Sequence, residues 1–242
     1  MESKILIIQI RENAETRKHE LDSIVKSTGL DMADLVSHDL TKQAMTLDEL
    51  EGIDALIIGG SGEFEAFGEY PNKESLAQVI RAAIGSGMPV LGICFGAQVL
   101  ADVMGGKCIP DKENEEIGTG VVYTTTAAAD DPLFRDCPES FKVNQGHHDR
   151  ILNLPDGCTI LAKTDKCPVQ AFRMGDRPVY GVQYHPELDK EGQLWRVNFF
   201  AGSYIDSKEE ADAVAQGVEE TPVAFRLLKD WVDRIVHKKD LT

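Results

Sequence analysis

A short apolar run that ends at a cysteine between glycines constrains the fold of this chain more than any other segment. Residues 89–93 read Pro-Val-Leu-Gly-Ile, Cys94 and Phe95 follow, and a helical pattern begins at Gly96. This is the layout of a nucleophile elbow, in which a strand delivers a side chain to the edge of a sheet and glycines relieve crowding at a sharp turn. The first amides of the following helix favour a thiolate and can hold an oxyanion. An isolated motif of this kind fits a buried core cysteine equally well, so a second feature is needed to distinguish a catalytic cysteine from a structural one.

The second feature is another apolar strand, residues 179–184, which ends in His185-Pro186-Glu187. Side chains two residues apart point to the same side of an extended chain, so Glu187 is placed to orient the imidazole of His185. Proline stops the strand from continuing in a central ladder and stiffens the turn. A base that is held by a carboxylate and faces a thiol is the general form of an activated nucleophile. Together the two strand ends predict a catalytic site formed by Cys94, His185 and Glu187.

Strands and helices alternate along the N-terminal half of the chain. The predicted strands are 4–10, 35–36, 55–60 and the run before Cys94, and the predicted helices are 15–28, 73–86, a short turn at 47–50 and the stretch after Cys94. Strands that are apolar on both faces and alternate with helices are typical of a parallel sheet. We therefore predict an α/β fold with a doubly wound, mostly parallel sheet flanked by helices. Functional groups in such sheets gather at the carboxyl ends of the strands.

The pattern changes from about residue 107, where short strands are separated by short turns. The predicted strands here are 121–125, 141–145, 159–164 and 169–173. They predict a small antiparallel segment before the strand that carries His185 returns to the main sheet. We predict one domain over residues 1–202 and a C-terminal helical extension over 203–242, in which Thr221-Pro222 signals a helix start. Apolar residues at helical spacing follow, and we predict that they pack on the same domain rather than dock a partner.

The composition disfavours several classes of protein. A net charge of −16 and a pI near 4.7 disfavour binding to a nucleic-acid backbone. The five cysteines are odd in number and none is spaced as Cys-x-x-Cys, so we predict free thiols in a reducing compartment. The N-terminus reads as a strand rather than a signal peptide, and no apolar run is long enough to span a membrane. We therefore predict a cytoplasmic protein that binds neither nucleic acid nor membranes.

Four segments resemble the class I glutamine amidotransferases, a family with a Cys-His-Glu triad. Residues 92–98 are similar to its nucleophile motif, and residues 185–187 to its His-Pro-Glu motif. Residues 59–61, Gly-Gly-Ser, stand where the family places the glycine turn of its oxyanion hole. Residues 141–157 look like the middle motif of the GMP synthetase amidotransferase domain. The resemblance covers residues 4–200 in the family's order, and it implies a flavodoxin-like fold and glutaminase chemistry.

The resemblance also implies a role for each matched residue. Cys94 attacks the side-chain amide of glutamine, His185 carries the proton to the leaving ammonia, and Glu187 orients His185. The backbone amides of Gly60 and Phe95 hold the oxyanion, and water then hydrolyses a γ-glutamyl thioester.

Further residues are implied to bind the substrate. Gln98 matches a position that helps to bind glutamine, and backbone groups around Gln145, Gly146 and His147 hold the two ends of the amino acid. Glycine at 146 replaces the serine that is common in the GMP synthetase motif, so a hydroxyl contact is missing there.

We predict no cofactor and no metal site, because no further His or Cys cluster accompanies His147 and His148. The acidic stretch 113–116 is interpreted as a solvated loop near the site, and Arg11 and Glu12 are weaker candidates for the pocket lining.

Three interpretations of the function remain open. The first is a stand-alone glutaminase, or an amidotransferase that delivers ammonia to a separate synthetase, since the rest of the chain is too short to form one. The second is a hydrolase of γ-glutamyl peptides or γ-glutamyl amines with the same chemistry. The third is a non-catalytic protein with a regulatory role, and the intact triad of Cys94, His185 and Glu187 argues against it.

Overall fold

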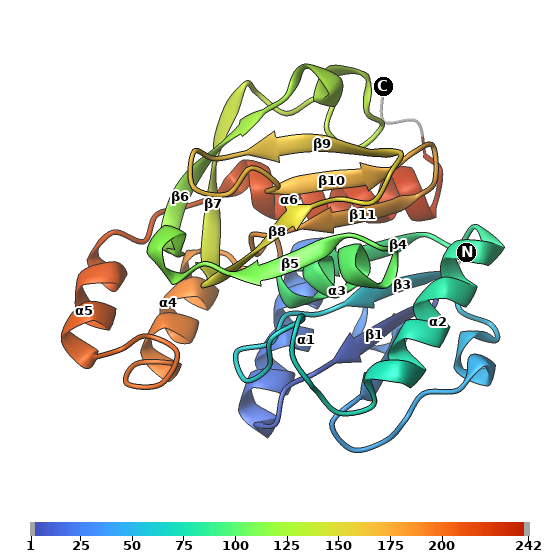
Figure 1. Ribbon diagram of the computed structural model, residues 1–242, viewed down its shortest axis with the longest axis horizontal. Helices are drawn as coiled ribbons and strands as arrows, with labels where there is room; N and C mark the ends of the chain where they lie inside the picture. Colours follow the sequence, from blue (N-terminus) through green and yellow to red (C-terminus); the bar gives the residue numbers. More distant parts are fainter. Residues whose placement is uncertain (1–2, 240–242) are drawn as a thin grey trace.

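A nine-stranded mixed sheet forms the centre of the molecule (Figure 1). The computed structural model describes residues 3–239, and the strands of this sheet run in the order β2-β1-β3-β4-β11-β10-β9-β6-β7. Neighbouring strands are parallel from β2 to β11 and antiparallel from β11 to β7. The strands are β1 Ile5–Gln9, β2 Leu35–Asp39, β3 Ala55–Ile58, β4 Val90–Ile93, β6 Glu116–Thr124, β7 Ser140–His147, β9 Cys158–Lys163, β10 Ala171–Met174 and β11 Val179–Val182.

Helices cover both faces of the parallel half of the sheet. Alternate residues of β1 enter different cores: Ile5 and Ile7 pack with α1 and α6, whereas Leu6 and Ile8 pack with α2 and α3. The helices are α1 Ala14–Thr28, α2 Lys73–Ser86, α3 Phe95–Val103, α4 Lys190–Phe199, α5 Lys208–Gln216 and α6 Pro222–Asp230, with a π-helical continuation Trp231–Val236 and short 3-10 turns at Met32–Asp34, Leu47–Leu50, Lys112–Asn114 and Thr126–Asp130. The predicted doubly wound α/β fold is confirmed.

The antiparallel strands differ from the prediction in extent and in place. They do not form a separate segment but extend the main sheet beyond β11. Strand β6 begins at Glu116 and pairs along its length with β7. The glycine-rich and polar start of β6 hid this part of the strand. A second sheet pairs β5 Lys107–Pro110 with β8 Asp149–Asn153, where no strand is predicted, because both runs are short and only partly apolar.

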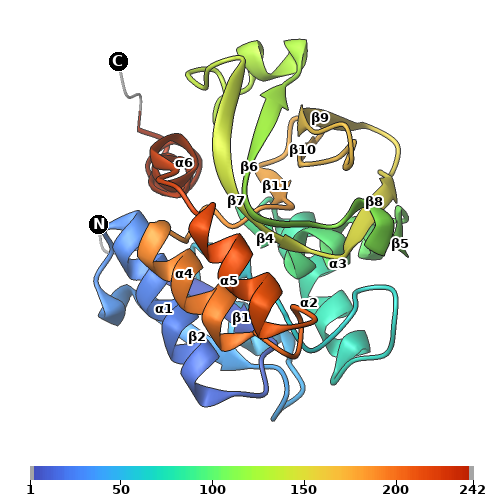
Figure 2. The same cartoon turned by 90° about the vertical axis from the view of Figure 1, so that its left-hand side faces the viewer.

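The last part of the chain packs against the sheet and against α4. Ala224, Leu227 and Leu228 of α6 and the fully buried Trp231 lie in the same core as β1. Helix α5 lies beside α4 (Figure 2), where Ala211 joins a small apolar cluster with Val197. The division of the chain at residue 202 stays a prediction. Among residues 3–239, no helix combines the length and the apolar character needed to cross a membrane.

Candidate active site

Cys94 sits at a strained turn between the central strand β4 and helix α3. Its backbone has φ +51° and ψ −107°, a conformation that residues other than glycine rarely adopt. A Cβ atom on Gly92 would lie 2.5 Å from the carbonyl oxygen of Gly96, and one on Gly96 would overlap the carbonyl oxygen of Ile58. The two glycines therefore let the helix begin against the sheet immediately after the cysteine, as the sequence predicts.

His185 and Glu187 follow β11, the strand next to β4. The two strands are parallel, with Val182 opposite Ile93, so their carboxyl ends meet at the same edge. His185 Nδ1 lies 2.8 Å from Glu187 Oε1. Because a carboxylate only accepts, Nδ1 carries the proton of a neutral imidazole and Nε2 keeps its lone pair. The sequence-predicted spacing thus produces an oriented base.

Cys94 and His185 are neighbours of the same two glycines, Gly60 and Gly146. A Cβ atom on Gly60 would lie 3.1 Å from His185 Cε1 and 3.7 Å from Cys94 Cβ. The carbonyl oxygen of Gly146 accepts from Cys94 Sγ at 3.7 Å, and a Cβ atom on Gly146 would lie 3.5 Å from His185 Nε2. The structure therefore brings the three predicted catalytic side chains together.

Burial decides the charge state of this group. It raises the pKa of the Cys94 thiol to about 12, against the opposing effects of Arg11 and of the Phe95 amide. Burial also lowers the pKa of His185, although the Glu187 charge pulls it upward. Burial disfavours ionisation of Glu187 too, but His185 and Arg196 hold its pKa at about 2. At neutral pH the thiol and the imidazole are both uncharged, so the helix amides do not produce the resting thiolate that the sequence suggests.

One of the two predicted oxyanion donors is occupied. The N–H of Gly60 donates to Glu20 Oε1 at 3.2 Å, and the same oxygen pairs with Arg11 Nε at 3.0 Å. Both Glu20 and Arg11 are almost fully buried. In this conformation the Gly60 amide is therefore occupied, because Glu20 on α1 reaches it across the fold, and the predicted role of Gly60 as an oxyanion donor stays a prediction. The other donor, the Phe95 amide, faces the cysteine and lowers its pKa.

The predicted substrate residues divide into two groups. Gln98 and His147 line a hollow together with Cys94, which we call the thiol-side hollow. Gln145 and Gly146 line a second hollow together with His185, which we call the imidazole-side hollow.

The Gln98 side chain already has partners. Gln98 Nε2 donates to the carbonyl oxygen of Asp149 at 3.1 Å and to Gln183 Oε1 at 3.2 Å, so its Oε1 is the atom left to meet a substrate. Gln183 in turn donates to Cys94 Sγ at 3.7 Å.

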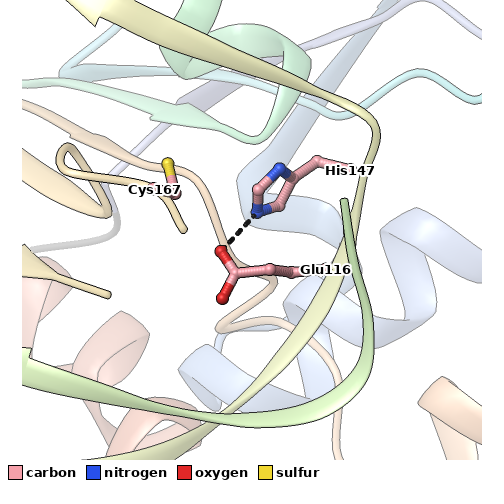
Figure 3. Close-up of side chains that lie close together, drawn as sticks. All are labelled: Glu116, His147 and Cys167. Carbon is pink, nitrogen blue, oxygen red and sulfur yellow. Dashed lines mark ion pairs between the residues drawn. The ribbon is translucent and has the colours of Figure 1, made fainter. Parts of the chain in front are cut away.

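His147 belongs to a cluster with Glu116 and Cys167 (Figure 3), whose ligand-type atoms lie within 4.8 Å of one another. The prediction that no further His or Cys cluster accompanies His147 and His148 is therefore wrong for His147, because the loop before β10 brings Cys167 to β7. His147 Nδ1 donates to the carbonyl oxygen of Asp149 at 3.0 Å, and its Nε2 lies 3.3 Å from Glu116 Oε2. The same Glu116 oxygen accepts from Gln170 Nε2 at 2.6 Å. Thr164 Oγ1 donates to this oxygen as well, at 3.1 Å, and the predicted absence of a metal stays a prediction.

Three side chains at the site were not singled out from the sequence. Arg196 of α4 places Nη1 3.1 Å from Glu187 Oε1 and 3.1 Å from His185 Nδ1. Gln183 stands two residues before His185, and this spacing is the one local signal that could have found it. No local sequence pattern indicates Tyr204 or Arg196. They reach the site from a loop and a helix that lie far from Cys94 in the sequence. Arg11, a weaker candidate, does line the imidazole-side hollow.

Comparison with known proteins agrees with this geometry. Residues 10–200 match the family model described as glutamine amidotransferase class-I. The chain belongs to the class-I glutamine amidotransferase family. A glutamine amidotransferase of Thermotoga maritima has a similar structure, with a TM-score of 0.79 and 25% identity over 98% of this chain and 99% of that one.

Similar curated sequences include glutamine-hydrolysing GMP synthases and single subunits of such enzymes. One subunit of the Methanocaldococcus jannaschii enzyme is 30% identical over 185 residues, which is 75% of this chain and 88% of that protein. The Syntrophomonas wolfei enzyme is 38% identical over 134 residues, which is 55% of this chain and 24% of that protein. This chain thus spans nearly all of some relatives and about a quarter of others.

Proposed function

We propose that this chain hydrolyses the side-chain amide of glutamine to glutamate and ammonia through a γ-glutamyl thioester on Cys94. The observation that carries the proposal is that Cys94 Sγ and His185 Nε2 both lie beside Gly146, at the carboxyl ends of β4 and β11. Glu187 fixes the imidazole in the tautomer that leaves Nε2 free to take a proton. Membership of the class-I family supports the same chemistry.

Both reacting groups start uncharged, so the proton moves as the bond forms. His185 Nε2 takes the thiol proton while Cys94 Sγ attacks the amide carbon. The imidazolium that results faces the Glu187 carboxylate, which stabilises its charge. His185 then passes the proton to the amide nitrogen, the carbon–nitrogen bond breaks, and ammonia leaves. A water molecule, deprotonated by His185, hydrolyses the thioester and restores the thiol.

The oxyanion of the tetrahedral intermediate needs donors aimed at the amide carbonyl. The Phe95 amide is one of them, and a typical donor of this kind contributes about 3 kcal/mol. We propose that Gly60 supplies the second after its N–H leaves Glu20, to which it donates in this structure. The proposed second donor therefore forms only when glutamine or a partner protein reorients the Gly60 peptide.

The thiol-side hollow is the proposed site of the amino-acid end of glutamine. Gln98 and His147 line this hollow together with Cys94, whereas Gln145 and Gly146 line the imidazole-side hollow. The ammonia acceptor is proposed to be a separate synthetase, because relatives of similar length are named as single subunits of GMP synthase.

The test is the release of ammonia and glutamate by the purified chain, with Cys94→Ala as the control. Release from glutamine that requires Cys94 supports the proposal, and stimulation by a co-purifying synthetase supports the partner. A higher kcat/KM for γ-glutamyl peptides or amines than for glutamine would reassign the chain as a γ-glutamyl hydrolase. No release from any donor, with or without a partner, would contradict the proposal and favour the non-catalytic, regulatory role.

A further inference from the structure

Tyr204 borders both hollows of the active site, as do Ser61 and Gly62. The thiol-side hollow contains Cys94 and the imidazole-side hollow contains His185, and Tyr204 lines both of them. Residue 204 lies outside the segment 10–200 that matches the family model. A segment beyond the matched region therefore shapes the catalytic site of this chain.

Hydrogen bonds and stacking hold the Tyr204 ring in place. Its hydroxyl donates to the carbonyl oxygen of Gly146 at 3.1 Å and accepts from the N–H of His148 at 3.1 Å. The ring stacks on the His148 ring with centroids 4.0 Å apart. Gly146 is also the residue whose carbonyl accepts from Cys94 Sγ, so the phenol is tied directly to the nucleophile's surroundings.

The chemistry assigns an occupant to each hollow. The leaving nitrogen takes its proton from His185 Nε2, so the leaving group must lie on the side of the imidazole. The glutamyl part stays bound to Cys94 and lies on the other side of Tyr204. The walls of the imidazole-side hollow include the apolar side chains of Val197, Phe200 and Ile205, which leave little room beyond the nitrogen.

The charged side chains that line the imidazole-side hollow are arginines. Arg11 and Arg196 both line it, whereas no Asp or Glu of the described residues 3–239 does so. The carboxylates that pair with these arginines, Glu20 and Glu187, lie behind the lining. Gln145 is 1% exposed, and neither its Oε1 nor its Nε2 has a hydrogen-bond partner within the described part of the chain. Arg196 Nη2 is likewise buried and unpartnered there. Such a surface favours a neutral or anionic group over a cation.

We propose that the imidazole-side hollow receives the leaving group, that Arg11 and Arg196 exclude cationic amines from it, and that Tyr204 limits its size. This inference rests on the proposed γ-glutamyl transfer to Cys94. In each turnover a bond forms between Cys94 Sγ and the carbonyl carbon of the γ-glutamyl amide, the bond between that carbon and the nitrogen breaks, the nitrogen gains the proton held by His185, and the amine leaves uncharged. The substrates are then glutamine and γ-glutamyl conjugates of small neutral or acidic amines.

The charge claim is tested with three γ-glutamyl conjugates of similar size, those of butylamine, 1,4-diaminobutane and 4-aminobutyrate, beside glutamine. The rate of γ-glutamyl thioester formation on Cys94 is followed by intact mass. We expect glutamine to react fastest and the cationic conjugate about tenfold more slowly than the neutral one, with the acidic conjugate at least equal to the neutral one. Equal rates for the cationic and neutral conjugates would overturn the charge claim.

The size claim is tested with two variants of Tyr204 and one control. Tyr204→Ala opens the partition, so all three conjugates should gain about tenfold relative to glutamine while their charge order persists. Tyr204→Phe keeps the ring and loses the bonds to Gly146 and His148, so it should lower kcat without changing the ratios. Tyr123→Ala removes an exposed tyrosine and should leave every rate unchanged.

The outcomes separate this inference from the function on which it rests. Ratios that stay unchanged in a folded Tyr204→Ala variant would overturn the size claim while glutamine hydrolysis stands. If no donor, glutamine included, acylates Cys94 in any variant, the proposed function fails and the inference fails with it.

Discussion

Glu187→Gln tests the electrostatic basis of the mechanism. The carboxylate lies 2.8 Å from His185 Nδ1 and 3.1 Å from Arg196 Nη1, and it is 1% exposed. The amide keeps the shape of the side chain and one acceptor, but it removes the charge that faces the imidazolium in the transition state. The substitution therefore separates charge from position.

The transition-state stabilisation that Glu187→Gln should lose can be estimated in two ways. A charge-assisted hydrogen bond contributes about 1.5 kcal/mol more than a neutral one. Opposite charges about 4 Å apart at an effective dielectric of about 20 attract by about 4 kcal/mol. Because these values describe the same interaction, a loss of about 3 kcal/mol is expected, or roughly a hundredfold in kcat. Loss of the imidazole in His185→Ala should be more severe.

The pH dependence of kcat/KM tests the direction in which each charge shifts the pKa of His185. His185 acts as a base only when neutral, so kcat/KM falls as the pH drops through its pKa, which burial sets below the usual 6.5. The Glu187 charge raises this pKa and the Arg196 charge lowers it. Glu187→Gln should therefore move the acid limb to lower pH, and Arg196→Met should move it to higher pH.

The assay is steady-state glutamine hydrolysis over a pH series, with circular dichroism to establish that each variant is folded. A folded Glu187→Gln variant within threefold of the wild-type kcat would refute the charge argument, in view of the roughly hundredfold loss expected. If the acid limb of the pH profile moves in the same direction in both variants, the assigned roles of Glu187 and Arg196 are refuted.

Three further predictions concern the elbow, its thiol and the buried Glu187. Gly96→Ala should prevent folding or lower the midpoint of thermal unfolding strongly, because its methyl group overlaps the carbonyl oxygen of Ile58; an unchanged midpoint would contradict this. A glutamine analogue with an electrophile at the γ position should label Cys94 alone, whereas iodoacetamide should react faster at the partly exposed Cys158; peptide mass mapping distinguishes them. Glu187 stabilises the fold above its unfolded pKa near 4.5, and this contribution is lost as the pH falls towards its folded pKa of about 2. Acid unfolding of Glu187→Gln should therefore depend less on pH in this window, and an identical dependence would disprove the linkage.

The sequence alone determined the features that depend on neighbouring residues. Gly92 and Gly96 are needed because helix α3 begins close against the strands, so the elbow at Cys94 can be recognised as a local sequence motif. The spacing of His185 and Glu187 follows from the repeat of an extended chain, and the alternation of apolar strands and helices predicts the doubly wound sheet. These interactions span only a few residues and therefore appear directly in the sequence pattern.

Tertiary structure decided the features that depend on distant segments. Glu20 of α1 binds the amide of Gly60, and the loop after α4 delivers Tyr204, so the sequence pattern predicts neither the partner of this amide nor the place of Tyr204. Helix amides alone would favour a thiolate, but burial outweighs them and keeps Cys94 protonated. Desolvation depends on everything that packs around a group, and no local pattern records it.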